Sequence, residues 1–120
     1  MAEIKSYRDL VAWRKSFALG LSVYRATKSF PDREKYGITS QVCRSAVSVA
    51  SNVAEGYGRG SSQDYVRFLR MARGSLYELD TQLLFAMELG YLSSDAHDVM
   101  QAELDECGRV LAGLIRSLEP

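Results

Sequence analysis

Apolar residues recur at every third or fourth position through most of the chain, in four segments separated by short runs rich in glycine, proline and serine. The segments cover about residues 6–29, 39–57, 62–89 and 94–118. This spacing places apolar side chains along one face of an α-helix, and no segment shows the strict alternation of a half-buried strand. The pattern therefore predicts four helices and no β-sheet.

Each predicted helix has an apolar stripe that is expected to face a common core. In the first helix we expect Leu10, Trp13, Phe17, Leu21 and Tyr24. In the second we expect Val42, Ala46, Val49, Ala50 and Val53. In the third we expect Tyr65, Phe68, Leu69, Ala72, Leu76, Leu79, Leu83 and Met87. In the fourth we expect Val99, Leu104, Cys107, Leu111, Leu114 and Leu118.

Helix ends are marked by residues that favour caps and turns. A serine followed three residues later by an aspartate forms a capping-box pattern at Ser6 and again at Ser61. Pro31 ends the first helix, the glycines at 56, 58 and 60 end the second, and Gly90 ends the third. Because such short connections force consecutive helices to be antiparallel, we expect an all-α, up-down-up-down four-helix bundle in a single domain, residues 1–120.

Charge is distributed unequally along the chain. Residues 1–73 contain 13 Lys and Arg against 6 Asp and Glu, whereas residues 74–120 contain 2 against 9, and the total is neutral. A basic half and an acidic half can offer a basic face to a polyanion, or can pair within one molecule or between copies. Packing of the acidic fourth helix beside the basic first helix would account for much of the contrast.

Few residues suit catalysis or metal binding. His97 is the only histidine and is expected to be solvated, so no catalytic triad and no metal-ligand spacing is present. Cys43 and Cys107 lie far apart within helical patterns, which indicates buried, reduced thiols. The glycine-rich run 56–60 follows a helix and lacks the lysine of a phosphate-binding loop. We expect no enzyme, no cofactor and no metal.

The N-terminus has no apolar stretch typical of a signal peptide, and no apolar run approaches the roughly 18 residues of a membrane span. These features predict a cytoplasmic protein with no membrane association.

The third helix needs a covering partner near its C-terminal end. Residues 83–87 are apolar on every side, and Leu84 and Phe85 point away from the expected core. We therefore expect a homo-oligomer with these two residues in its interface; in the alternative, the turn at Tyr91 and Leu92 shields Phe85. Gly74 lowers helix propensity by about 1 kcal/mol relative to alanine, which indicates close approach of another backbone.

Four arginines favour binding of RNA or DNA through phosphate contacts. They lie at the start of the third helix and along its outer side, where helix N-terminal amides also favour anions: Arg59, Arg67, Arg70 and Arg73. In the alternative, Glu55 pairs with Arg59 and Asp64 with Arg67, as ordinary helix-surface ion pairs do. The same protein would then be an oligomeric scaffold or protein-interaction module without a nucleic-acid role.

Several sequence blocks resemble one known family. They occupy residues 9–15, 30–41, 48–56, 72–79 and 89–92, and the most specific are Asn-Val-Ala-Glu-Gly at 52–56 and Gly-Ser-Leu-Tyr-Glu-Leu at 74–79. Together they closely resemble the four-helix bundle proteins of the bacterial 23S ribosomal RNA intervening-sequence family, also called S23-type. The likeness covers most of the chain.

The resemblance implies a cytoplasmic bacterial protein that forms a homopentameric ring, and it implies no activity or protein partner. A similar accessory protein of diversity-generating retroelements is strongly basic and binds nucleic acid and a reverse transcriptase; the present chain differs in being neutral. The residues that match the family motifs are expected to have structural or assembly roles: Ser48, Asn52, Glu55, Gly56 and Gly74.

Overall fold

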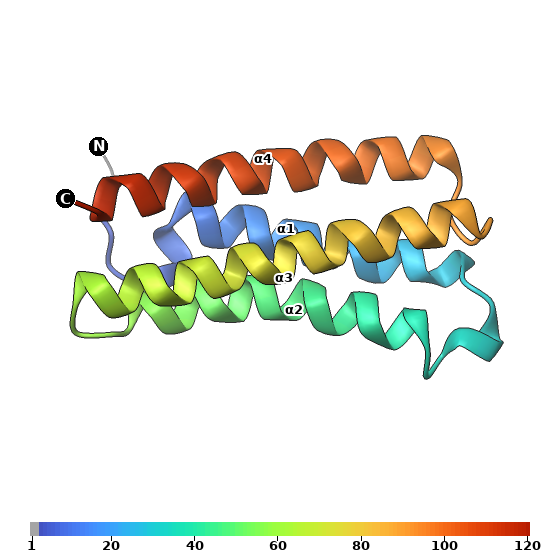
Figure 1. Ribbon diagram of the computed structural model, residues 1–120, viewed down its shortest axis with the longest axis horizontal. Helices are drawn as coiled ribbons and strands as arrows, with labels where there is room; N and C mark the ends of the chain where they lie inside the picture. The colour runs from blue at the N-terminus through green and yellow to red at the C-terminus, as the bar shows by residue number, and fades with distance from the viewer. Residues whose placement is uncertain (1–2) are drawn as a thin grey trace.

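Four long helices run antiparallel to their neighbours in a computed structural model, which describes residues 3–120 (Figure 1). They are α1 (Val11–Ala26), α2 (Ile38–Tyr57), α3 (Ser62–Glu88) and α4 (Ser94–Leu118). Helix α1 packs against α2 and α4, and α3 packs against the same two helices, so the bundle is closed. Its extents are 44 × 26 × 23 Å. The predicted up-down-up-down bundle is confirmed.

The first helix is shorter than the sequence pattern indicates. Short 3₁₀ turns occupy Tyr7–Asp9 and Thr27–Ser29, and extended backbone at Leu10 (ψ 130°) separates the first turn from α1. The Ser6 hydroxyl accepts a hydrogen bond from the Arg8 amide, and the Asp9 carboxylate accepts from the Ser6 amide. The predicted capping box is present, but it caps this 3₁₀ turn. Backbone amides of Lys5 and Ser6 hold the pKa of Asp9 below its usual value.

The other helix ends follow the expected chemistry. At the start of α3 the Ser61 hydroxyl accepts a hydrogen bond from the Asp64 amide, and Ser93 caps α4 in the same way through the Ala96 amide. Gly90 has a φ of +80°, the left-handed conformation that glycine adopts without strain. This conformation lets the Tyr91 amide donate to the Ala86 carbonyl and closes the α3 terminus.

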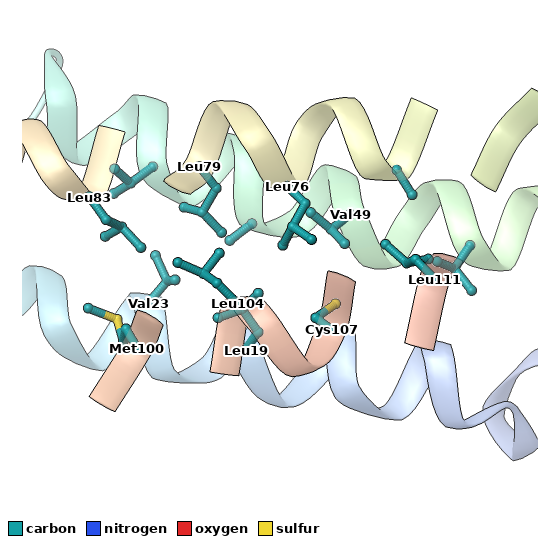
Figure 2. Close-up of a cluster of buried hydrophobic side chains, with 14 of the residues drawn as sticks. Leu19, Val23, Val49, Leu76, Leu79, Leu83, Met100, Leu104, Cys107 and Leu111 are labelled. Atoms are coloured by element: carbon teal, nitrogen blue, oxygen red, sulfur yellow. The ribbon is translucent and has the colours of Figure 1, made fainter. Parts of the chain in front are cut away.

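Leucine and valine side chains from all four helices meet along the bundle axis (Figure 2). The apolar stripes predicted for α2 and α3 are buried or half-buried throughout. Figure 2 shows that α1 contributes Leu19 and Val23 to this core, opposite Leu79 and Leu83 of α3.

The stripe predicted for α1 is only partly right. Leu10 and Trp13 are half-buried and pack against the core. Phe17, Leu21 and Tyr24 are wrong as core residues, because they are 47%, 41% and 49% exposed. The buried positions are instead Ala12, Ser16, Leu19 and Val23. Helix α1 is apolar on two faces, and the face with smaller side chains allows closer packing against α2 and α4.

Two predictions on α4 are also wrong. Val99 is 64% exposed, and Met100 takes the expected place in the core. His97 is buried rather than solvated, since the same turn of the helix carries it inward with Met100. Its Nε2 atom has no hydrogen-bond partner within residues 3–120.

Candidate interaction surfaces

A ladder of polar contacts joins α2 to α3. The Ser45 hydroxyl donates to the Glu78 carboxylate at 2.7 Å, and the Ser48 and Ser75 hydroxyls lie 2.8 Å apart. The Asn52 amide donates to the Ser48 carbonyl and approaches its hydroxyl at 3.0 Å. Ser75 and Glu78 belong to the family block at 74–79, and Ser48 and Asn52 to the block at 48–56. Ser45 and Ser48 therefore join α2 to α3, and Asn52 orients Ser48 from within α2.

Gly56 lies where α2 comes close to α3. A Cβ atom at this position would lie 2.8 Å from the Cβ atom of Phe68, which is too close, and 3.2 Å from the Tyr65 carbonyl oxygen, which is tight. Gly74 is different, because no side chain and no backbone of another helix lies within 4 Å of a Cβ atom built there. The expected close approach to Gly74 is therefore absent among residues 3–120.

Three of the four candidate arginines are paired with carboxylates. Arg59 pairs with Glu55 at 3.4 Å and Arg67 with Asp64 at 3.5 Å, the two intrahelical pairs considered above. Arg70 pairs with Glu119 beyond the end of α4. Arg73 is half-buried and has no carboxylate within 4 Å among the described residues. The structure brings these arginines to one end of the bundle but compensates most of their charge.

Arg59 and Arg67 also share one aromatic ring. Their guanidinium carbons lie 4.6 Å and 4.7 Å from the centre of the Phe68 ring, within the range of cation–π contacts. Both side chains remain about half exposed. Phe68 itself is buried, so the two arginines cover the core at the α2–α3 corner and keep their charged groups in solvent.

The outer side of α3 exposes the two residues predicted for an interface. Phe85 is 62% exposed and Leu84 is 47% exposed. Tyr91 and Leu92 do not shield Phe85, because the Tyr91 ring packs on Phe30 and its hydroxyl donates to Glu34. Phe85 instead borders a shallow hollow with Ile38, Gln41 and Leu89 between α2 and α3.

A second apolar surface lies between α1 and α2, where the sequence pattern placed core residues. A groove of about 320 Å³ is lined mainly by aromatic and aliphatic side chains and by small residues of α2. The Trp13 and Phe17 rings stack at 4.9 Å along one wall, and Leu21 and Tyr24 continue it. Val47, Ala50 and Ala54 form the opposite wall.

The remaining chemically reactive side chains are buried singly. The Cys107 thiol lies 3.4 Å from the Ser16 hydroxyl, which also donates to the Ala12 carbonyl. Burial raises the pKa of Cys107, and it also raises the pKa of the half-buried Cys43, so both thiols are held in the protonated form. Both cysteines are free. Within residues 3–120 no three histidine, cysteine or acidic side chains are grouped as metal ligands would be.

None of the helices in the described part of the chain combines the length and apolar character needed to cross a lipid bilayer.

Comparison with known proteins identifies relatives of this bundle. A solved structure from Bacteroides thetaiotaomicron, described as a protein of unknown function from the S23 ribosomal protein family, superposes with a TM-score of 0.81 at 19% sequence identity. The match covers 88% of this chain and 98% of that one, and at this identity it supports the shared fold. No curated protein matches the sequence. The family model described as 23S rRNA-intervening sequence protein matches residues 8–113. The chain therefore belongs to the family of 23S rRNA-intervening sequence proteins.

Proposed function

We propose that this protein is a non-enzymatic homo-oligomeric scaffold whose subunits associate through the outer face of α3. The supporting observation is the exposure of Leu84 and Phe85, at 47% and 62%, on one helix of a closed bundle. Soluble monomers rarely leave large aromatic and aliphatic side chains adjacent on the surface, because burying a Phe or Leu side chain stabilises by about 1.5–3 kcal/mol. The subunit number implied by the family resemblance is five.

Phe85→Asp is expected to dissociate the oligomer, because a carboxylate cannot enter an apolar contact without losing its hydration. Native mass spectrometry should give a multiple of 13.4 kDa for the unmodified protein and the single-chain mass for the variant. Val99→Asp is the matched control: Val99 is 64% exposed on α4, one turn before Glu103, which contacts Ser22 of α1. A single-chain mass before substitution, or an unchanged oligomer after it, would contradict the proposal.

Binding of RNA or DNA is the second candidate function. The observation that favours it is the contact of both Arg59 and Arg67 with the Phe68 ring, with Arg70 about one turn beyond Arg67 along α3. Their exposed guanidinium groups can exchange a carboxylate for a phosphate, which binds arginine with the same bidentate geometry. The compensation by Glu55, Asp64 and Glu119 lowers the affinity expected of this surface, so we rank it second.

A salt series on labelled structured RNA and duplex DNA tests the second candidate. Phosphate contacts predict that log K falls linearly with log salt, with a slope of about −0.9 per phosphate neutralised on duplex DNA. Arg67→Glu with Arg70→Glu should reduce the steepness by about two such contacts and leave the native mass unchanged. Arg109→Glu with Arg116→Glu on α4 changes net charge equally and serves as control. An equal loss of nucleic-acid affinity in both double variants, or no binding at low salt, would contradict a specific nucleic-acid surface at Arg67 and Arg70.

A further inference from the structure

The hollow between α2 and α3 is apolar at one end and charged at the other. Ile38, Phe85 and Leu89 line the end near the start of α2 and the end of α3, which lie together in Figure 1. Arg44 of α2 and Glu78 of α3 line it further along the two helices. Its volume of about 740 Å³ is in the range of small-ligand sites. The α2–α3 hollow therefore suits a ligand with one apolar and one charged end.

The two charged residues of the α2–α3 hollow do not neutralise each other. Arg44 and Glu78 carry opposite charges on opposite helices, yet Arg44 has no carboxylate within 4 Å among residues 3–120. Both side chains are exposed, so their charged groups are accessible from solvent. A bound group that carries both a positive and a negative charge would pair with the two residues at once.

The Glu78 carboxylate is held in place before any ligand binds. The buried Ser45 hydroxyl donates to its Oε1 atom at 2.7 Å. The Oε2 atom has no hydrogen-bond donor among the residues that the structure describes, so it can accept from an incoming group. Because the side chain is already oriented, it loses less conformational freedom when a ligand binds.

Two glutamines also line the hollow, Gln41 on α2 and Gln82 on α3. The Gln82 Oε1 atom is buried and has no hydrogen-bond partner within residues 3–120. Buried amide oxygens are normally paired, so this wall of the hollow favours an occupant that brings an N–H donor.

An α-amino acid with a large apolar side chain has this combination of groups. Its ammonium and carboxylate groups lie on one carbon atom, so its head group matches Glu78 and Arg44 together. Phe85 lies seven residues beyond Glu78, about 10 Å along the axis of α3 and on the same face. Phe85 and Leu89 are 62% and 57% exposed, and covering them favours a large apolar side chain over that of glycine or alanine.

We propose that the α2–α3 hollow binds a free α-amino acid with a large apolar side chain, with Arg44 holding its carboxylate and Glu78 its ammonium group. The side chain of the ligand packs against Phe85 and Leu89. This inference goes beyond the proposed scaffold and does not require it, since all the residues of the site belong to one chain. Phe85 is shared with the proposed subunit contact, whereas Arg44 and Glu78 are not, so the test uses these two.

A series of related ligands tests the site on the unmodified protein. Saturation-transfer difference NMR is expected to show saturable binding of L-phenylalanine. N-acetyl-L-phenylalanine lacks the ammonium group and L-phenylalaninamide lacks the carboxylate. Each should bind about five- to tenfold more weakly, the effect of losing one partly exposed charge-assisted hydrogen bond. L-alanine, which has both charges and no large side chain, should also bind more weakly.

Substitutions in the hollow assign each charge to its residue. Arg44→Gln should weaken binding of L-phenylalanine by about the same factor and leave the affinity for L-phenylalaninamide unchanged, because the amide does not pair with the guanidinium group. Glu78→Gln keeps an acceptor for Ser45 and should spare N-acetyl-L-phenylalanine in the same way. Arg116→Gln removes an exposed arginine of α4 outside the hollow and is the matched control, which should leave all these affinities unchanged.

The absence of saturable L-phenylalanine binding overturns the proposal. Equal affinity for L-phenylalanine and its two blocked derivatives does so too, and so does an Arg44→Gln variant that loses L-phenylalanine and L-phenylalaninamide alike. Far-ultraviolet circular dichroism checks that each variant is folded, and the ligand series gives its answer without any substitution. Native mass measured on the same samples reports on the homo-oligomer separately, so a protein of single-chain mass that binds L-phenylalanine contradicts only the proposed function.

Discussion

Gly56→Ala is expected to lower the free energy of unfolding by about 1–3 kcal/mol, the usual range for inserting a methyl group into packed structure. The added Cβ atom would lie 2.8 Å from the Cβ atom of Phe68 and 3.2 Å from the Tyr65 carbonyl oxygen. Neither neighbour is the mobile end of a long side chain, so relief requires α2 and α3 to separate. Separation in turn lengthens the contacts of Ser48 with Ser75 and of Ser45 with Glu78.

Gly74→Ala is the matched control and is expected to raise the free energy of unfolding, whereas Gly56→Ala lowers it. Both glycines are helical, but the space around Gly74 is open for at least 4 Å, so alanine should stabilise α3 by up to about 1 kcal/mol through helix propensity. Urea denaturation of both variants measures the difference. A Gly56→Ala protein as stable as the unmodified one would show that the α2–α3 contact does not require glycine. Loss of oligomer mass in Gly74→Ala would place the close approach to Gly74 between subunits.

The sequence predicts the α2–α3 half of the bundle well for a physical reason. Each of these helices has one dominant apolar face over most of its length, and its other faces carry charged and polar residues, so only one orientation buries enough apolar surface. The departure from this rule at residues 83–87 correctly indicated that Leu84 and Phe85 would be exposed in a single chain. Exposure follows from helix geometry, whereas the identity of what covers these residues does not.

Helix α1 is predicted less well because two of its faces are apolar. The three-and-four spacing of apolar residues favoured Phe17, Leu21 and Tyr24, but the core uses Ala12, Ser16, Leu19 and Val23. Ser16 is fully buried and would be rejected from a core by its polarity; its hydroxyl satisfies that polarity locally by donating to the Ala12 carbonyl at 2.7 Å. The sequence does indicate the groove, because α1 carries a second apolar face in addition to the one that enters the core. Only one of two apolar faces on a helix can face the core of a closed bundle, so the other is left at the surface.

The ion pairs of the basic surface could be predicted only in part, because one of them joins residues that are far apart in the sequence. Arg59 with Glu55 and Arg67 with Asp64 are separated by four and three residues and follow from helix spacing. Arg70 with Glu119 joins positions 49 residues apart and depends on where the last turn of α4 lies beside α3. The charge excess of the first half of the chain therefore overstates how much of it is free to bind a polyanion.

The two apolar faces of α1 can be distinguished by their response to truncation and to protein concentration. Leu19 is fully buried within the bundle of one chain (Figure 2), so Leu19→Ala should leave a cavity and lower the free energy of unfolding by about 2–5 kcal/mol. Leu21, 41% exposed two residues later, loses few contacts within its own chain. In protein dilute enough to be dissociated, Leu21→Ala should therefore lower the free energy of unfolding by well under half as much as Leu19→Ala does.

The dependence of this stability loss on protein concentration tells whether Leu21 takes part in subunit association. If Leu21 contacts a second copy in the proposed homo-oligomer, its truncation weakens association, and the stability lost relative to the unmodified protein grows as total concentration rises. The Leu19→Ala loss should be the same at every concentration, because that cavity lies inside one subunit. Urea denaturation across a concentration series, with native mass measured at each point, separates these behaviours. Equal and concentration-independent losses at both positions would mean that α1 is rotated in solution to bury Leu21 in its own core, and the groove would then not exist.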